Sequence, residues 1–292
     1  FKAEEFADWH AWLAATVKRL WPGVAVHSKQ LDGFGVDTAA DFERFGKFSD
    51  VNGTDNGICY VPDTDSFWRG DLFFSLMTSL KPVHIVNSET HLTPDLCESP
   101  IAYAPVYTAL FQQFVQGVAG SAAWVWEDTG FDLFKERHCF VGDIYRRPMA
   151  ILAIRDASAD ANRLARELRD SFNVPAQAAI LYSRPTLTLS PTADADTTAA
   201  YEALAGTGRK PGFLSENQLQ AGQTGAVKLL VAAGAAYVEP ATAQALVRFA
   251  AAGGCIVTVG DCFKHDTNGH LLATAVPVAT RLDRALLKKP AE

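Results

Sequence analysis

Residues 82–91 have the sequence PVHIVNSETH, and this stretch decides the fold. The β-forming residues Val83, Ile85 and Val86 are followed at once by a polar cluster that contains Glu89. A short apolar run bounded by turn residues indicates a buried parallel strand. The C-terminal end of such a strand is where α/β barrels carry their catalytic groups. Glu89 is therefore a candidate catalytic carboxylate, and a glutamate that merely faces water is the alternative.

The composition is that of a soluble globular protein with room for two domains. The chain has 292 residues, of which 48% are hydrophobic and 20% charged, and its mean hydropathy is +0.02. A net charge of −7 gives no electrostatic footprint for nucleic acid. No apolar run reaches the length of a membrane span. We therefore expect neither nucleic acid nor a membrane as a partner.

The five cysteines are odd in number and widely spaced, and the sequence holds no CxxC pair. This pattern predicts neither a disulfide framework nor a structural zinc site. It favours a reducing cytoplasm, while secretion stays open because a mature product lacks its signal. Cys262, His265 and His270 could be drawn as a metal cluster, but their loop is better interpreted as a polar turn. We expect no metal and no organic cofactor.

Strand and helix patterns alternate through the first part of the chain. The helix predicted at Glu4–Leu20 has Phe6, Trp9, Leu13, Val17 and Leu20 on its presumed buried face. Further helices are expected at 39–48, 65–80, 102–118 and 156–172, and strands at 24–27, 50–55, 83–89 and 121–128. Such alternation specifies a parallel α/β sheet. Only about four strand–helix units precede Phe172, whereas a (β/α)₈ barrel has eight. We therefore expect half of a barrel, either a piece of a longer chain or one partner of a split barrel.

A second, smaller doubly wound α/β domain is expected after Pro175. Its predicted strands are 178–182, 212–214, 227–232 and 255–259, and its predicted helices are 197–205 and 240–252. Gly253 and Gly254 suit the C-terminal cap of the last helix. We divide the chain into residues 1–174, 175–272 and a tail at 273–292.

The order of these parts resembles the β-galactosidases of glycoside hydrolase family 42. The resemblance rests on strands ending in Glu89 and in Trp126–Glu127, and on second-domain segments from AILYS to FAAAGGCIVTVGD, residues 179–261. It implies strands five to eight of a (β/α)₈ TIM barrel, followed by a flavodoxin-like domain of the trimerisation type. It also implies that Glu89 is the nucleophile. The acid/base glutamate of the family would then lie before Phe1.

Retaining hydrolysis needs a carboxylate nucleophile and a carboxylic acid about 5 Å apart. Glu89 must stay ionised and so needs hydrogen-bond donors. By the period of two, Asn87 lies on its side of the strand, and His91 could also donate, whereas His84 and Ser88 face the helices.

Further substrate-binding candidates lie at the same rim. Trp126 would give a sugar ring a stacking platform, with Trp124 deeper in the barrel and Glu127 on the opposite side. His27 and Asp55 follow the fifth and sixth strands, as do Lys29 and Asn56, and Trp68 opens the next helix with Arg69. For each polar residue alone, a solvated loop position is an equal alternative.

The sequence thus predicts a retaining glycoside hydrolase that acts on β-linked glycosides, with a carbohydrate substrate. We expect a homo-oligomer, or a complementary N-terminal half-barrel as partner. A carbohydrate-binding or scaffold protein without catalysis is the alternative. An amidotransferase-like regulatory domain is a third interpretation, although Cys255 begins a strand instead of standing at a strand-to-helix elbow.

Overall fold

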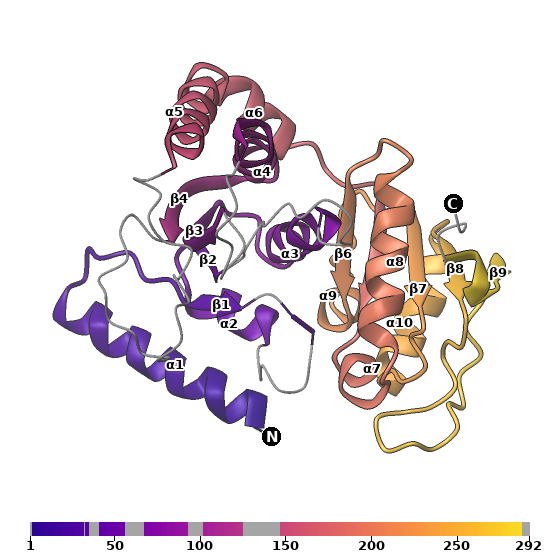
Figure 1. Ribbon diagram of the computed structural model, residues 1–292. Helices are drawn as coiled ribbons and strands as arrows, with labels where there is room; N and C mark the ends of the chain where they lie inside the picture. The colour runs from indigo at the N-terminus through magenta and orange to yellow at the C-terminus, as the bar shows by residue number, and fades with distance from the viewer. Residues whose placement is uncertain are drawn as a thin grey trace, which may run out of the picture. The chain divides into compact units, whose positions relative to one another are not determined.

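The computed structural model describes residues 2–31, 33–34, 41–55, 67–92, 102–124 and 147–287. The chain forms two compact units (Figure 1). Unit 1 comprises residues 1–32 and 40–174, and unit 2 comprises residues 33–39 and 175–292. Among the described residues, no helix is long and apolar enough to cross a membrane.

Unit 1 is built on a four-stranded parallel sheet whose strands follow one another in chain order. The strands are β1 (Lys29–Leu31), β2 (Asn52–Asp55), β3 (Ile85–His91) and β4 (Val118–Trp124). Sequential parallel pairing with helical crossovers is the arrangement of a partial (β/α)₈ barrel. In the described part of the chain, β1 and β4 each pair on one side only.

The helices of unit 1 alternate with these strands. They are α1 (Lys2–Leu20), α2 (Phe42–Phe48), α3 (Phe67–Leu80), α4 (Tyr103–Val115), α5 (Pro148–Arg163) and α6 (Ala165–Phe172). Leu72, Phe73, Phe74 and Leu76 make α3 the most deeply buried helix. Alanines of α5 pack on Val106 and Leu110 of α4 in a separate cluster. The single helix expected at 156–172 is interrupted at Leu164, where α5 ends and α6 begins.

Two predictions for the start of the chain are wrong. Helix α1 buries Ala7 and Ala14, while Trp9 is 54% exposed and Leu20 is 60% exposed. The helical period was correct, but it does not say which side of the helix packs on its neighbours, here chiefly α2. The first strand begins at Lys29 instead of Val24, because the short apolar run at 24–26 lies outside the sheet.

Unit 2 has a five-stranded parallel sheet in the order β6-β5-β7-β8-β9. Its strands are β5 (Ala178–Tyr182), β6 (Pro211–Ser215), β7 (Leu229–Ala233), β8 (Cys255–Val259) and β9 (Thr280–Leu282). Its helices are α7 (Arg184–Leu189), α8 (Ala193–Ala205), α9 (Glu216–Gln220), α10 (Pro240–Ala251) and the 3₁₀ turn η3 (Arg284–Leu287). Strand β9 pairs with β8, so residues 280–282 of the expected tail belong to this sheet.

The core of unit 2 lies between its central strands and the helices that follow them. It includes Leu181, Leu230 and Ile256 from strands, together with Leu246 and Phe249 from α10. Every residue of β5 and β6 is buried, which explains why these strands were predicted closely from unbroken apolar runs.

Candidate functional site

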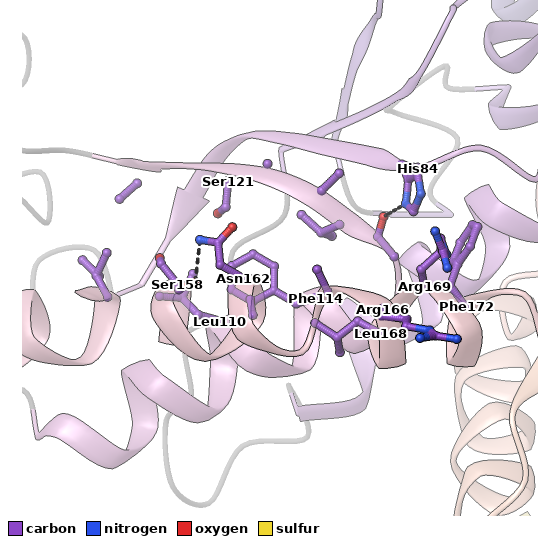
Figure 2. A pocket seen from close by; sticks show the side chains of 18 of the residues that line it. His84, Leu110, Phe114, Ser121, Ser158, Asn162, Arg166, Leu168, Arg169 and Phe172 are labelled. Atoms are coloured by element: carbon purple, nitrogen blue, oxygen red, sulfur yellow. Dashed lines mark hydrogen bonds between the residues drawn. The ribbon is translucent and has the colours of Figure 1, made fainter. Parts of the chain in front are cut away.

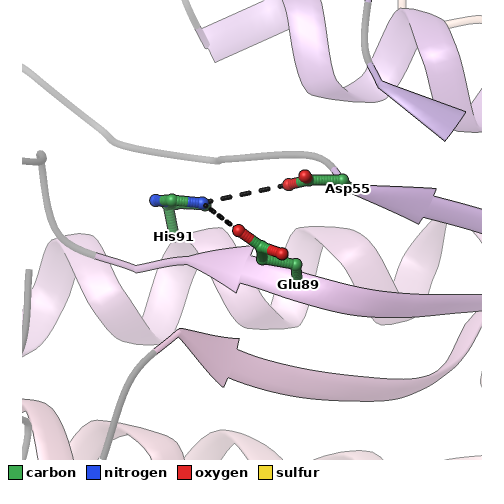
Figure 3. Close-up of side chains that lie close together, drawn as sticks. All are labelled: Asp55, Glu89 and His91. Carbon is green, nitrogen blue, oxygen red and sulfur yellow. Dashed lines mark hydrogen bonds and ion pairs between the residues drawn. The ribbon is translucent and has the colours of Figure 1, made fainter. Parts of the chain in front are cut away.

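Four charged or titratable side chains from three neighbouring strands meet at the C-terminal edge of the unit 1 sheet. Lys29 belongs to β1, Asp55 ends β2, and Glu89 and His91 lie at the end of β3. Figure 3 shows Asp55, Glu89 and His91 turned toward one another. Parallel strands bring Asp55, Glu89 and His91 together because their C-terminal ends share one edge of the sheet. Lys29 is the first residue of β1 and reaches this edge with its long side chain.

The ammonium group of Lys29 connects the two carboxylates. Its Nζ lies 3.0 Å from Oδ2 of Asp55 and donates a short hydrogen bond to Oε2 of Glu89. On the other side, Nε2 of His91 lies 3.2 Å from Oε1 of Glu89 and 3.9 Å from Oδ1 of Asp55. Each oxygen of Glu89 therefore has its own nitrogen partner.

A bulge in β3 turns Glu89 toward this cluster. Thr54 of β2 pairs with Asn87, yet the next residue, Asp55, pairs with Glu89, so that one residue of β3 is extra. An extra residue reverses the alternation of side chains beyond it. The buried positions accordingly change from Ile85 and Asn87 to Thr90.

The prediction that Asn87 shares a side with Glu89 is therefore wrong. Asn87 is fully buried, and its amide donates a 3.1 Å hydrogen bond to Oε1 of Gln113 in α4. The bulge separates it from the charged face. His91, in contrast, lies beside Glu89 as expected.

The local charges favour the anionic form of Glu89. Partial burial alone would raise the pKa of Glu89, but the hydrogen bonds and charges of Lys29 and His91 outweigh it and hold that pKa below its usual range. For Lys29, burial would lower the pKa, but the two carboxylates hold it above its usual range. An anionic glutamate with 19% of its side chain exposed remains accessible to a substrate.

An aromatic ring borders the cluster. Trp124 at the end of β4 is 36% exposed, and its ring centroid lies 6.5 Å from that of His91. Trp124 was expected deeper in the barrel than Trp126, and this relative depth stays a prediction. In the β3–β4 register His91 and Trp124 are partners, and neither sequence segment alone indicates this pairing. Trp126 and Glu127 lie outside the described residues.

The remaining predicted site residues fall in different places. His27 precedes β1 instead of following it, because that strand begins at Lys29. It lies over Gly53, where a Cβ would come within 2.2 Å of its Nδ1. Trp68 lies in the first turn of α3, but its side chain and Asn56 lie outside the described residues.

Asp55, Glu89 and His91 could in principle hold a metal ion, since one ligand atom of each lies within 4.8 Å of the others. Lys29 already places a positive charge against both carboxylates. A divalent cation would have to displace this ammonium group, so we interpret the cluster as a network of ion pairs between side chains.

A cavity of about 730 Å³ lies elsewhere in unit 1, between β4 and helices α4, α5 and α6 (Figure 2). His84 accompanies Arg166 and Arg169 in a lining that otherwise consists of small, apolar and uncharged polar residues, and its described residues include no acidic side chain. His84 stacks on Phe172 at 4.8 Å, in agreement with its predicted packing role. The candidate nucleophile Glu89 is not among the residues that line this cavity.

Comparison with known proteins gives no match to a family model and none to a curated protein sequence. Solved structures do match. An exo-carrageenase of glycoside hydrolase family 42 from Bacteroides ovatus aligns with a TM-score of 0.80 at 16% identity, over 97% of this chain and 41% of that one. The fold is that of glycoside hydrolase family 42.

Other matches agree. A β-galactosidase from Rahnella sp. R3 gives a TM-score of 0.73 at 15% identity, over 93% of this chain and 41% of that one. An exo-β-1,4-mannosidase from Opitutaceae bacterium strain TAV5 gives 0.61 at 12% identity, over 89% and 51% of the two chains. The chain spans between two fifths and about half of the length of these proteins. The resemblance to family 42 inferred from the sequence is thus confirmed at the level of the fold.

Proposed function

We propose that the protein acts as a retaining glycoside hydrolase on β-linked glycosides, with Glu89 as its nucleophile. One observation carries the proposal. Glu89 lies at the C-terminal end of a parallel strand, where Lys29 and His91 hold it as an accessible anion. The glycoside hydrolase fold of the chain supports this reaction class, and the solved β-galactosidases of the same fold make a β-galactoside the first substrate to test.

The chemistry assigned to Glu89 is nucleophilic substitution in two steps. One carboxylate oxygen forms a bond to the anomeric carbon as the bond to the leaving oxygen breaks, and the leaving group takes that electron pair and a proton from an acid. Water then attacks the same carbon and loses its proton, while Glu89 departs as a carboxylate. Both steps require an anionic Glu89 at the start and at the end.

The acid of the first step needs a second carboxyl group about 5 Å from the nucleophile. Asp55 lies close to Glu89, but Lys29 bridges the two groups and leaves no room for a glycosidic oxygen between them. We therefore assign Asp55 to anchoring Lys29 and propose that the acid comes from outside the described residues.

A complementary half-barrel is the proposed source of that acid. Its presence would give partners to the edges of β1 and β4 that are unpaired among the described residues. It would also cover the exposed aromatic residues of α1, which include Trp9 and Trp12, and fill the cavity beside β4. The half-barrel would belong to the same polypeptide or to a partner chain.

Unit 2 is proposed to be a flavodoxin-like assembly module. Its strand order, 2-1-3-4-5 counted along the chain, supports this assignment. We propose that it promotes homo-oligomerisation, and sedimentation of the protein tests this. A monomer at high concentration would contradict the proposal.

A carbohydrate-binding or scaffold protein without catalysis remains the second candidate. The observation that favours it is the closed ion-pair network, in which Lys29 already occupies the space beside Glu89. Turnover of a panel of aryl β-glycosides with activated leaving groups discriminates the two, since such leaving groups depart without an acid. Hydrolysis that is lost in Glu89→Gln supports the enzyme, and equal hydrolysis by both proteins removes Glu89 from the mechanism.

A further inference from the structure

Lys29 is the cation that contacts both carboxylates of the site. We infer that Lys29 is a positioning residue, which stays anchored to Asp55 and presents a fixed positive charge to Glu89 through both steps of the reaction. This inference rests on the proposed function. It assigns a role that fold and strand position alone do not give to a lysine.

The geometry separates the two contacts of Lys29. Leu31, Asp55 and Glu89 lie in register across β1, β2 and β3, and Lys29 lies two residues before Leu31. Its long side chain therefore runs toward the C-terminal edge to reach both carboxylates. The Asp55 side chain is 11% exposed and that of Glu89 is 19% exposed, so the anchor is the more buried of the two carboxylates.

The groups that face Glu89 come from each neighbouring strand. Lys29 of β1 and His91 of β3 each contact an oxygen of Glu89. Asp55 of β2 adds a second negative charge, and Trp124 of β4 lies beside His91. His91 is a counter-charge only when it is protonated, whereas Lys29 carries a full positive charge, and its pKa is held above the usual range. Lys29 is therefore the lasting counter-charge within the described cluster.

The contact of Lys29 with two carboxylates has a consequence during turnover. When Glu89 becomes bonded to the sugar, it loses its negative charge and most of its attraction for Lys29. Asp55 still holds the ammonium group at 3.0 Å. Lys29 is then in place to stabilise the carboxylate that forms again as water releases the sugar. Loss of Lys29 should therefore slow release of the sugar, and it should slow formation of the glycosyl-enzyme only at pH values where Glu89 becomes protonated.

A purely structural salt bridge between β1 and β3 is the competing explanation. It predicts that Lys29→Met destabilises the sheet and raises the pKa of Glu89, since a stabilising salt bridge also lowers the pKa of its carboxylate, but leaves the rate of sugar release unchanged. Lys29→Arg keeps the charge and can contact both carboxylates, so sugar release in this variant should stay near the wild-type rate. Asp55→Asn tests the anchor, since it leaves the Lys29–Glu89 pair but removes the second attachment.

The experiment follows the carboxyl ¹³C resonance of Glu89 with pH, assigned by its absence in Glu89→Gln. We expect the Glu89 carboxyl to titrate at higher pH in Lys29→Met than in the wild type. In Lys29→Arg it should titrate near the wild-type pH. Lys264→Met is the matched control, because Lys264 forms an exposed ion pair with Asp261 in unit 2; it should change nothing. A Glu89 titration that is the same in Lys29→Met and wild type would overturn the inference.

Labelling with an activated 2-deoxy-2-fluoro-β-galactoside separates this inference from the proposed function. In Lys29→Met, release of the fluorosugar from the labelled protein at neutral pH should slow about tenfold, as loss of a charged hydrogen bond to the departing carboxylate implies, and the acidic limb of labelling should move to higher pH. A wild type that is never labelled would overturn the proposed function. A wild type that is labelled, with the same release rate and pH profile in Lys29→Met, would overturn only the role of Lys29.

Discussion

Glu89 and Glu216 are the same residue type at equivalent points of two parallel sheets, but their surroundings shift the pKa of each in opposite directions. Glu89 ends β3 in unit 1 and is paired with Lys29 and His91. Glu216 follows β6 in unit 2 and is 6% exposed. Its Oε1 lies 2.5 Å from the Ser183 hydroxyl, and its Oε2 accepts hydrogen bonds from Thr242 and from the backbone N–H of residue 239.

The groups that contact each glutamate determine whether its carboxyl group is charged. Burial raises the pKa of Glu216, and its neutral hydroxyl partners only partly offset this, whereas cationic partners lower the pKa of Glu89. The Ser183 oxygen also lies 2.9 Å from the carbonyl oxygen of Tyr237. One hydroxyl hydrogen cannot serve both acceptors, so a proton on Glu216 would satisfy the network. A glutamate at a strand end is thus a candidate nucleophile only where cations keep it ionised.

The largest effect is expected on catalysis. Glu89→Gln should lower the hydrolysis of an activated aryl β-galactoside by about a thousandfold or more, because it removes the nucleophile. Glu216→Gln, the matched change in unit 2, should leave the rate near that of the wild type. Steady-state kinetics of both variants checks this, and a comparable loss in both would end the contrast between the two glutamates.

The second effect is on stability. Glu216→Ala should lower the unfolding free energy by about 3 kcal/mol or more, because buried donors lose their acceptor. Glu216→Gln should cost less and should alter the pH dependence. Since folding raises the pKa of Glu216, its contribution is present at low pH and is lost as pH rises through the folded-state pKa. Denaturant unfolding against pH should show a flatter profile for Glu216→Gln; a steeper one would contradict the assignment.

Asp71 extends the comparison to a buried carboxyl with amide partners. Burial raises its pKa to about 6, although Gln112 and Gln116 partly offset the shift. Unit 1 should therefore lose stability as pH rises from about 4 to 6. Asp71→Asn should stabilise the protein by about 2 kcal/mol at pH 7 and by little at pH 4. Thermal unfolding at both values tests this, with exposed Asp8→Asn as the control.

The smallest effect concerns Asn87, which lies near Glu89 in sequence but on the other side of the sheet. Asn87→Ala should cost about 1 kcal/mol of unfolding free energy through the lost hydrogen bond to Gln113. The rate of fluorosugar labelling should stay unchanged once folding is accounted for. A strong loss of labelling in a folded Asn87→Ala protein would return this residue to the site.

Sequence reasoning succeeded where a pattern is carried by long or fully apolar runs. Residues 178–182 and 255–259 were predicted as strands with their observed bounds. It failed where one residue decides. The bulge in β3 inserts a single residue, so that Asn87 and Glu89 lie on opposite faces of the sheet. Nothing in the alternation of residues 82–91 indicates this bulge.

Partnership was also beyond the sequence. Lys29 was one of several polar residues at the expected rim, and its contact with Asp55 and Glu89 depends on the register of three strands separated along the chain. The apolar face of α1 was predicted, but the packing of Ala7 and Ala14 instead of Trp9 depends on a tertiary contact that periodicity does not contain.

The most direct test of the account is to identify the residue that bonds to the sugar. The protein is incubated with an activated 2-deoxy-2-fluoro-β-galactoside, digested, and its peptides are sequenced by mass spectrometry. The account predicts a single adduct on Glu89 that is absent from Glu89→Gln. An adduct on Glu127, or hydrolysis of the aryl glycoside that persists in Glu89→Gln, would contradict it.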